Sequence, residues 1–232
     1  MHLLRNSKSM RGGETQMKRN VTIMLMLLIA VMAYQVSASA NLLSDPGFEN
    51  GGSAIALKDG PWTWDGGSNG GSFYAPDVTL SGVKAAKVVL WGESANDYAY
   101  FVEEFEEIDF TASYVVSANF LNNSASALNS TGTAAIQVKW FNSLGSELAM
   151  DESSAFNSTY ALDQWHNISV VSIAPTLASK VAVVIAAKAN ADYVGESTVY
   201  VDEMGFDVVP EPASLLMLAS GLLGIFGISR KR

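Results

Sequence analysis

The 232-residue chain contains no cysteine and only two histidines. Without cysteine, disulfide bonds, thiol catalysis and cysteine-ligated zinc are all excluded. Only one histidine, His166, lies beyond the N-terminal region, so a metal site built from two histidines is excluded there as well. A fold made from this sequence must be stabilised by its hydrophobic core, or by a metal ion bound through oxygen ligands.

Basic residues are scarce in the central part of the chain. Eight of the 14 lysines and arginines and two of the 23 acidic residues lie in residues 1–40 and 210–232. The central residues 41–209 therefore hold six basic and 21 acidic residues, a net charge of −15. DNA, RNA and anionic lipid are bound by basic surfaces, so no nucleic-acid partner is expected for this region.

Residues 1–40 end in a pattern typical of a secretory signal peptide. The pair Lys18-Arg19 precedes an apolar run from Val21 to Ala33, and Ala38-Ser39-Ala40 supplies the small residues of a cleavage site. The pattern predicts export, with signal peptidase cutting after Ala40 and leaving Asn41 as the first mature residue.

The first 16 residues are polar and fit no part of a signal peptide. We therefore expect translation to start at Met17, with Met10 as the alternative. Under either start, residues 1–40 are an N-terminal extension and signal peptide that the mature protein lacks.

The C-terminal residues 210–232 combine three features. Pro210-Glu211-Pro212 is followed by an apolar segment from Ala213 to Ile228 and by the basic end Arg230-Lys231-Arg232. A 16-residue helix rises about 24 Å, slightly less than the roughly 30 Å of a bilayer core, so it predicts a marginal transmembrane helix. Because basic residues tend to remain cytoplasmic, this end should lie inside and everything before Pro210 outside.

This order of features resembles the PEP-CTERM sorting signal of Gram-negative bacteria that make extracellular polysaccharide. The resemblance implies recognition and cleavage by an exosortase, after transient anchoring in the inner membrane. Delivery to the cell surface or the extracellular matrix would follow. The alternative is a plain C-terminal transmembrane anchor that contains Pro210-Glu211-Pro212 by accident.

Residues 41–209 have the length of one domain, and their pattern is that of strands. Alternating or β-branched runs are separated by turn-rich pieces such as Gly66–Gly71, and no helical period lasts for three turns. The pattern predicts an all-β fold, an antiparallel β-sandwich of the jelly-roll type. The strands are expected at Ala86–Leu90, Tyr98–Val102, Tyr114–Phe120, Ala135–Phe141, Asn167–Ile173, Val181–Ala186 and Ser197–Val208.

Both ends of this domain resemble galactose-binding-like jelly rolls, including many carbohydrate-binding modules. The resemblance rests on Asn41–Glu49 with Trp62-Thr63-Trp64, on Trp165–Val170 with Ile173-Ala174-Pro175, and on Val199–Phe206. In such modules a structural calcium ion often ties the first strand to the last, and Glu49 and Asp202 match those positions. The resemblance thus implies a calcium site, and hard carboxylate oxygens suit Ca²⁺. The alternative is that both residues are ordinary polar ends of strands.

Aromatic side chains are the candidate sugar contacts, because an aromatic ring packs against the apolar face of a pyranose. Trp62, Trp64 and Trp91 stand near glycine-containing loops, where rings can remain exposed at the rim of a sandwich. Trp140 shares a strand face with Ile136 and Val138 and is expected in the core. The remaining aromatic candidates are Trp165, Tyr74, Tyr98 and Tyr100.

A catalytic centre is not expected. The densest acidic cluster, Glu103–Asp109, is interpreted as a solvated loop or strand edge, or a loose cation site. Adjacent residues of a strand point to opposite faces and make poor catalytic pairs. No serine lies in a Gly-x-Ser-x-Gly motif that would pair with His166.

These observations predict an exported, non-enzymatic surface or matrix protein that binds or associates with extracellular polysaccharide through its jelly-roll domain. One alternative is a structural or adhesive protein without specific sugar binding. A glycoside-acting enzyme is a further alternative, for which the sequence offers no identifiable pair of carboxylates.

Overall fold

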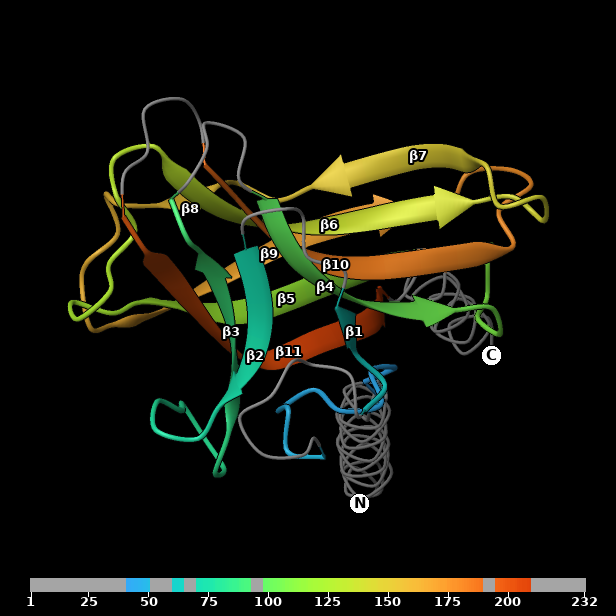
Figure 1. The fold of residues 1–232 in the computed structure, drawn as a ribbon. Coiled ribbons are helices and arrows are strands. Elements are labelled where there is room, and N and C mark those ends of the chain that lie inside the picture. The colour runs from blue at the N-terminus through green and yellow to red at the C-terminus, as the bar shows by residue number, and fades with distance from the viewer. Residues whose placement is uncertain (1–40, 51–59, 65–69, 93–97, 190–194, 210–232) are drawn as a thin grey trace, which may run out of the picture. The chain divides into compact units, whose positions relative to one another are not determined.

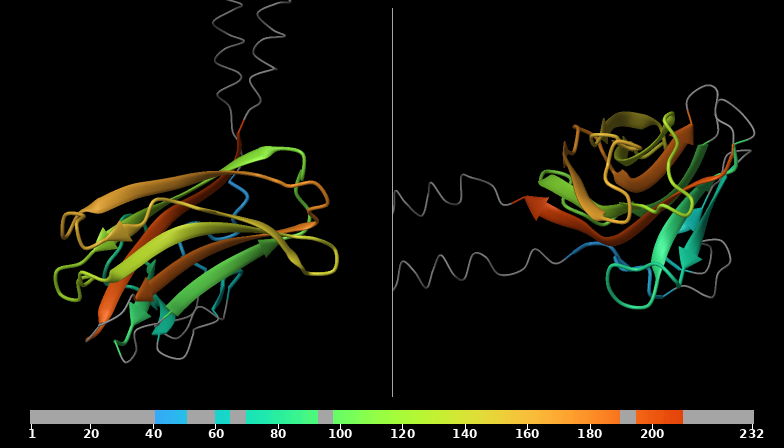
Figure 2. Two further views of the ribbon diagram at one scale, coloured as in Figure 1. Left: turned by 90° about the horizontal axis from the view of Figure 1, so that it is seen from above. Right: turned by 90° about the vertical axis from the view of Figure 1, so that its left-hand side faces the viewer.

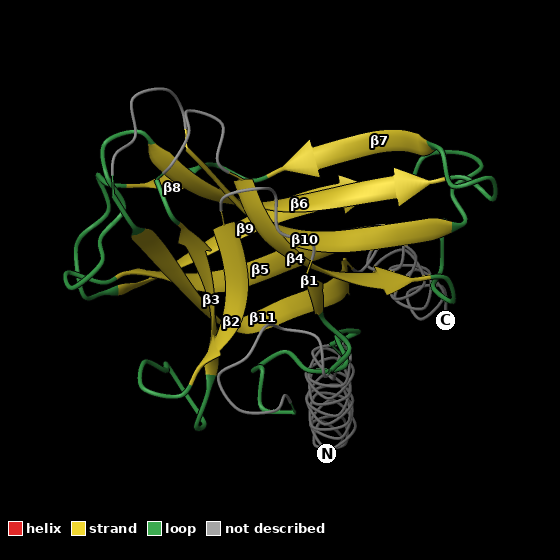
Figure 3. Cartoon of the chain, in the orientation of Figure 1, coloured by secondary structure: helices red, strands yellow, loops and turns green. Residues whose placement is uncertain are grey.

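The computed structural model describes residues 41–50, 60–64, 70–92, 98–189 and 195–209. The predicted signal peptide and the predicted C-terminal helix lie outside these ranges. Within them, all regular secondary structure is β-strand, as Figure 3 shows. None of the described residues belongs to a helix that could span a membrane.

The strands form two antiparallel sheets that face each other (Figures 1 and 2). The six-stranded sheet consists, in spatial order, of β1 (Thr63–Trp64), β4 (Tyr98–Phe105), β10 (Lys180–Ala189), β6 (Gly132–Phe141) and β7 (Glu147–Glu152), with β8 (Phe156–Asn157) also paired to β6. The five-stranded sheet consists of β2 (Gly70–Ala75), β3 (Ala85–Leu90), β11 (Ser197–Val209), β5 (Ser113–Asn122) and β9 (Trp165–Ile173). The predicted β-sandwich is confirmed, and each of the seven predicted runs lies within a strand.

Four strands were not predicted: the two-residue strands β1 and β8, and the longer strands β2 and β7, which were missed for different reasons. β2 begins at Gly70, inside a glycine-rich segment that the sequence pattern assigned to a turn. A Cβ at Gly70 would lie 2.6 Å from the Cβ of Ala99, so glycine here permits close approach of the two backbones. β7 is an edge strand in which four of six residues are exposed, and its apolar residues Leu148, Ala149 and Met150 are consecutive. It therefore lacks the apolar alternation that reveals a half-buried strand.

A single large hydrophobic cluster fills the space between the sheets. On β6 the side chains of Ile136, Val138 and Trp140 point inward, as predicted, and none of the three is exposed. Trp140 also joins the two sheets, because its Nε1 donates a hydrogen bond to Ser172 Oγ on β9 at 2.7 Å. Residues 41–209 thus enclose a core of their own, and this segment is a suitable unit for expression by itself.

The start of this segment is attached to its last strand. Leu42 N donates to Phe206 O at 2.9 Å, and Met204 N donates to Pro46 O at 2.8 Å. The side chain of Asn41 adds a bond to Met204 O at 2.7 Å. The two ends of the segment therefore lie side by side.

The acidic cluster Glu103–Asp109 is not entirely the solvated segment that the sequence suggested. Glu103 and Glu104 belong to β4, and they point to opposite faces of the sheet. Glu104 is exposed, whereas Glu103 is buried and accepts a hydrogen bond from Ser44 N at 3.1 Å. Burial, supported by the nearby charge of Asp45, raises the pKa of the Glu103 carboxyl.

Candidate functional site on the six-stranded sheet

The six-stranded sheet carries a second apolar surface on the side that faces away from the core. Along β10 the core-facing residues alternate with Ala182, Val184 and Ala186, which form a separate hydrophobic cluster. The partly buried side chains packed against it are those of Tyr98, Tyr100, Val102 and Phe141. We call the surface formed by the outward side chains of β4, β10, β6 and β7 the outer face.

Small side chains occupy the middle of the outer face. Ala186 lies beside Tyr100 on β4 and beside Ala135 on β6. Although they face outward, Ala135, Ala182 and Ala186 are at most 5% exposed, because larger side chains stand around them. Tyr98 and Tyr100 form the β4 side, with ring centroids 5.2 Å apart. The outer face therefore has a low apolar floor next to two aromatic rings.

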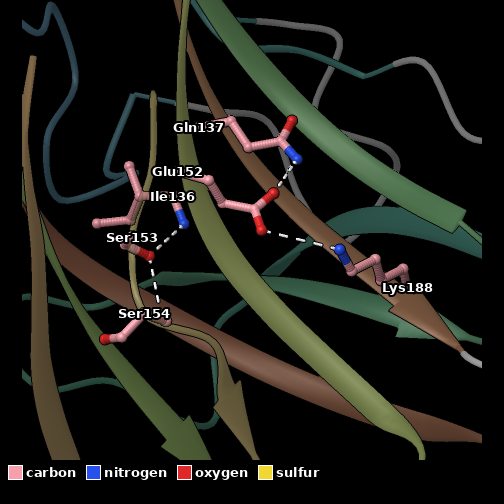
Figure 4. Close-up of polar contacts among 6 residues, drawn as sticks. All are labelled: Ile136, Gln137, Glu152, Ser153, Ser154 and Lys188. Carbon is pink, nitrogen blue, oxygen red and sulfur yellow. Dashed lines mark hydrogen bonds and ion pairs between the residues drawn. The ribbon is translucent and has the colours of Figure 1, made fainter. Parts of the chain in front are cut away.

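A polar network runs along one end of this floor (Figure 4). Gln137 Nε2 donates to Glu152 Oε2 at 2.7 Å, and Lys188 Nζ lies 3.8 Å from Glu152 Oε1. The network joins β6, β7 and β10, and it lies close to Tyr98 on β4. Burial, together with the charge of Glu152, raises the pKa of the Tyr98 hydroxyl, which therefore remains a hydrogen-bond donor at neutral pH.

The backbone around Glu152 is fixed by the residue that follows it. Ser153 N donates to Ile136 O at 2.9 Å, and Ser153 Oγ accepts from Ile136 N at 3.1 Å and donates to Ser154 O at 3.0 Å. These bonds extend the pairing of β6 with β7 past the end of the strand, and the two made by Ser153 Oγ are drawn in Figure 4. Glu152 is thereby held at a defined position on the outer face.

Two buried polar atoms on this face have no hydrogen-bond partner among the described residues. They are Gln137 Oε1 and Thr133 Oγ1, both on β6. Gln137 is 7% exposed, and its amide nitrogen is already used by Glu152. A buried polar atom without a partner costs about 1–3 kcal/mol, so such atoms call for a ligand or an ordered water molecule.

The lysines of the domain are concentrated on the outer face. Lys139, Lys180 and Lys188, three of the six lysines between residues 41 and 209, project from β6 and β10. Lys180 Nζ lies 3.1 Å from Glu104 Oε1 and 4.9 Å from the ring centre of Phe141. Lys139 makes no ion pair within the part of the chain that the structure describes.

The three tryptophans predicted as sugar contacts occupy different environments. Trp62 is fully buried, its ring packs edge-on against Phe101, and its Nε1 donates to Asp45 O at 2.9 Å. The expectation of an exposed ring is therefore wrong for Trp62, because its ring packs in the core between Phe48 and Phe101. Trp64 is partly buried and packs against the same core. Only Trp91 has a largely accessible ring, 42% exposed, and it is not on the outer face of the six-stranded sheet.

Glu49 and Asp202, the predicted calcium ligands, hold the same loop. Asp202 Oδ2 accepts from the backbone N–H groups of Leu80 and Ser81 at 2.8 and 3.1 Å. Glu49 Oε1 accepts from those of Val83 and Lys84 at 2.7 and 3.1 Å. The sequence resemblance thus identified a real convergence of the first and last segments of the domain.

The loop between these carboxylates depends on glycine. Gly82 has a φ of +63°, and a Cβ there would lie 1.9 Å from Glu49 Oε1. Gly47 lies close to both acids: its Cβ position would be 3.7 Å from Glu49 Cγ and 4.0 Å from Asp202 Oδ1. Burial raises the pKa of Asp202 although three backbone N–H groups donate to its carboxylate.

The residues at this loop fit a calcium ion only in part. Each carboxylate uses one oxygen to accept the loop amides, and Asp202 Oδ1 also accepts from Glu203 N at 2.8 Å. Among the described residues, no group of three His, Cys, Asp or Glu side chains is placed to hold a metal ion. Backbone carbonyl groups and water would have to supply the remaining ligands, as Ca²⁺ allows.

The predicted sorting and cleavage residues lie outside the described residues. These are Ala38 and Ala40 in the signal peptide, and Pro210, Glu211, Pro212, Arg230, Lys231 and Arg232 at the C-terminus. For the C-terminal group, sequence comparison gives an independent result. Residues 208–232 match the family model of the PEP-CTERM protein-sorting motif. The chain therefore carries this motif, which indicates a secreted protein that is transiently anchored through its C-terminus.

The sandwich itself is similar to several solved structures, although no curated protein matches the chain in sequence. The C-terminal family 22 carbohydrate-binding module of Clostridium thermocellum Xyn10B is 15% identical, with a TM-score of 0.51, over 75% of this chain and 99% of the module. An arabinose-bound GH51 α-L-arabinofuranosidase, MgGH51, is 19% identical, with a TM-score of 0.53, over 73% of this chain and 26% of the enzyme.

A third similar structure is the enzymatically active domain of tailspike protein 4 from bacteriophage CBA120. It is 12% identical, with a TM-score of 0.50, over 73% of this chain and 21% of that protein. The chain thus spans only about a fifth to a quarter of the two enzymes but nearly all of the binding module. At these identities the comparisons establish the fold, a β-sandwich shared with carbohydrate-binding modules.

The sequence analysis did not single out the residues of the outer face. Tyr98 and Tyr100 were among the aromatic candidates, but both faces of their strand are apolar, so the pattern does not distinguish core from surface. Gln137 and Lys139 alternate with Ile136, Val138 and Trp140, which are in the core. Once Trp140 is assigned to the core, the alternation alone places Gln137 and Lys139 on the opposite face.

Proposed function

We propose that the domain binds extracellular polysaccharide on the outer face of its six-stranded sheet, and that it does so after export to the cell surface or matrix. The observation that best supports this proposal is a pair of buried polar atoms without a partner among the described residues, Gln137 Oε1 and Thr133 Oγ1. They belong to the same sheet face as the apolar floor and two tyrosine rings. A sugar matches this combination, because it offers hydroxyl groups to the polar atoms and a C–H face to the rings.

Export is the context of this proposal. The PEP-CTERM motif at residues 208–232 indicates secretion, and exosortase is the enzyme that would process it. Signal peptidase would remove residues 1–40. We expect mass spectrometry of the protein from its native host to find Asn41 as the first residue and to find no Arg230–Arg232 end. Recovery of the intact chain from the cytoplasm would contradict export.

We propose binding without catalysis, on the basis of where the carboxyl groups lie. A glycosidase needs an acid with a raised pKa within reach of the ligand. Among the described residues, the two carboxyl groups with a raised pKa are Glu103 and Asp202, and both are buried and lie away from the outer face. Of the carboxylates on the outer face, Glu104 and Glu152 each pair with a lysine.

The test is affinity electrophoresis of residues 41–209 against a panel of soluble polysaccharides. We expect retardation in at least one polymer, and loss of most of this retardation in the variants Tyr100→Ala and Gln137→Ala. Trp91→Ala is the control, because its exposed ring lies elsewhere. If no polymer retards the domain, the alternative of a structural or adhesive protein without specific sugar binding is favoured.

A structural calcium ion is a second, separate proposal. The ion would bind between Glu49 and Asp202 and neutralise their charges. These two acids are far apart in sequence, and both already accept hydrogen bonds from the loop Leu80–Lys84. Its role would be to stabilise the fold in a chain without disulfides, so its effect should appear in the melting temperature.

A further inference from the structure

The outer face differs in charge from the rest of the domain. Residues 41–209 carry a net charge of −15, yet three of their six lysines project from this one surface. Lys180 is neutralised by Glu104 and Lys188 by Glu152. Lys139 has no ion pair among the described residues. Glu147, the register partner of the outward Phe141, is a third acid on this face, so three lysines balance three acids there.

Lys139 lies in the middle of this face. It is the register partner of Ala182 on β10 and of Met150 on β7, and it stands between Gln137 and Phe141 on its own strand. The residue is half-buried, and Gln137, whose amide oxygen has no partner among the described residues, lies two positions before it on the same face of β6. A ligand lying on the floor would therefore meet the Lys139 ammonium group on the side of the floor where Gln137 lies.

We propose that the outer face selects a polysaccharide that carries carboxylate groups, with the Lys139 ammonium group binding a carboxylate of one sugar unit. This inference rests on the proposed function and names its ligand class. A hydrogen bond between an ammonium and a carboxylate is stronger than one between neutral groups, so a half-buried lysine discriminates acidic from neutral sugars.

The acidity of the remaining domain does not prevent this contact. At about 0.15 M salt the Debye length is about 8 Å, so most of the distant acids are screened while a direct contact is not. The two ion pairs on either side of Lys139 also keep Glu104 and Glu152 occupied. An incoming carboxylate therefore meets the ammonium group of Lys139, which has no ion pair among the described residues.

The experiment compares matched polymers on residues 41–209. Polygalacturonate, alginate and hyaluronate are each paired with the same polymer after chemical reduction of its carboxyl groups, and neutral xylan and galactan complete the panel. We expect at least one acidic polymer to bind about tenfold more tightly than its reduced form. Raising the salt concentration should weaken binding of the acidic form but not of the reduced form.

The variant Lys139→Gln should weaken binding of the acidic polymer by about tenfold, and Lys139→Arg should restore most of it. Lys87→Gln is the matched control: it changes the net charge equally, but Lys87 is on β3 of the other sheet, 5.9 Å from the ring centre of Phe73. The Lys87→Gln variant should bind the acidic polymer as tightly as the wild type does. All variants should have the same melting temperature.

Equal or tighter binding of the reduced polymers would overturn the inference and leave the proposed function standing. The inference would also be overturned if Lys139→Gln and Lys87→Gln weakened binding of the acidic polymer equally. If no polymer of the panel binds, both the inference and the proposed function are overturned.

Discussion

Asn41 accepts a hydrogen bond from the backbone N–H of Phe206 through its side-chain oxygen, at 3.0 Å. The same oxygen accepts from Leu43 N, and the side-chain nitrogen donates to Met204 O. The residue that is predicted to follow the signal-peptide cleavage site is thus also the one that ties the start of the domain to β11. Cleavage even one residue later would remove this connection.

Replacing Asn41 should therefore destabilise the domain. We expect Asn41→Ala to lower the free energy of unfolding by about 1–3 kcal/mol, since partly buried backbone groups of Met204 and Phe206 lose their partner. Urea denaturation of residues 41–209 measures this. A loss below about 0.5 kcal/mol, the level of ordinary surface substitutions, would show that the attachment contributes little.

Glu103 should make stability depend on pH. Burial raises the pKa of Glu103 in the folded state, so the ionised carboxylate disfavours folding. This destabilisation grows as the pH rises from the unfolded pKa of about 4.5 through the folded pKa. We expect Glu103→Gln to raise the melting temperature at pH 7.5 and to have a smaller effect at pH 4.

The control for this experiment is Glu104→Gln, the exposed neighbour on the opposite face of β4. The difference in melting temperature between Glu104→Gln and the wild type should not increase with pH as it does for Glu103→Gln. Differential scanning calorimetry at the two pH values gives both differences. A Glu103→Gln variant that is less stable than wild type at pH 7.5 would contradict the assigned cause.

Calcium should stabilise the domain through Glu49 and Asp202. At a calcium concentration about 100 times the Kd, binding to the folded state adds about 2.7 kcal/mol to the free energy of unfolding. We therefore expect a higher melting temperature in calcium than in chelator, and no such difference for Asp202→Asn. Asp207→Asn, on the same strand, serves as control and should retain the effect. Identical melting temperatures of the wild type in calcium and chelator would exclude the site.

Trp62 and Trp91 should behave in opposite ways. Removing the fully buried ring of Trp62 should cost about 3–5 kcal/mol of stability, since it leaves a cavity against Phe48 and Phe101. Trp91→Ala should change stability by less than about 0.5 kcal/mol, as expected for an exposed residue. Equilibrium unfolding separates the two; similar losses would mean that Trp91 is also part of the core.

The sequence predicted the fold well because alternation records burial on one side of a strand. β5 and β6 have one apolar face and were found with nearly correct ends. β7 was not found, because an edge strand that buries little needs no apolar pattern. The buried position of Trp62 was not found either, because it depends on contacts with Phe48 and Phe101, which are distant in sequence.

The outer face could be predicted only in part for a similar reason. Its floor is made of alanines and Val184, small apolar residues that carry no functional signal by themselves. Its polar atoms come together only through the register of four strands, as in the contact between Gln137 of β6 and Glu152 of β7. By contrast, the pairing of Glu49 with Asp202 followed from a family resemblance that covers both ends of the domain.

The central claim is that sugar binds to the outer face of the six-stranded sheet. The most direct measurement is a backbone and side-chain NMR titration of residues 41–209 with a polymer that the domain binds. The account predicts that the largest shifts occur at Tyr98, Tyr100, Gln137 and Ala186. Shifts centred instead on Trp91 and Phe73 of the other sheet, with these four signals unchanged, would contradict it.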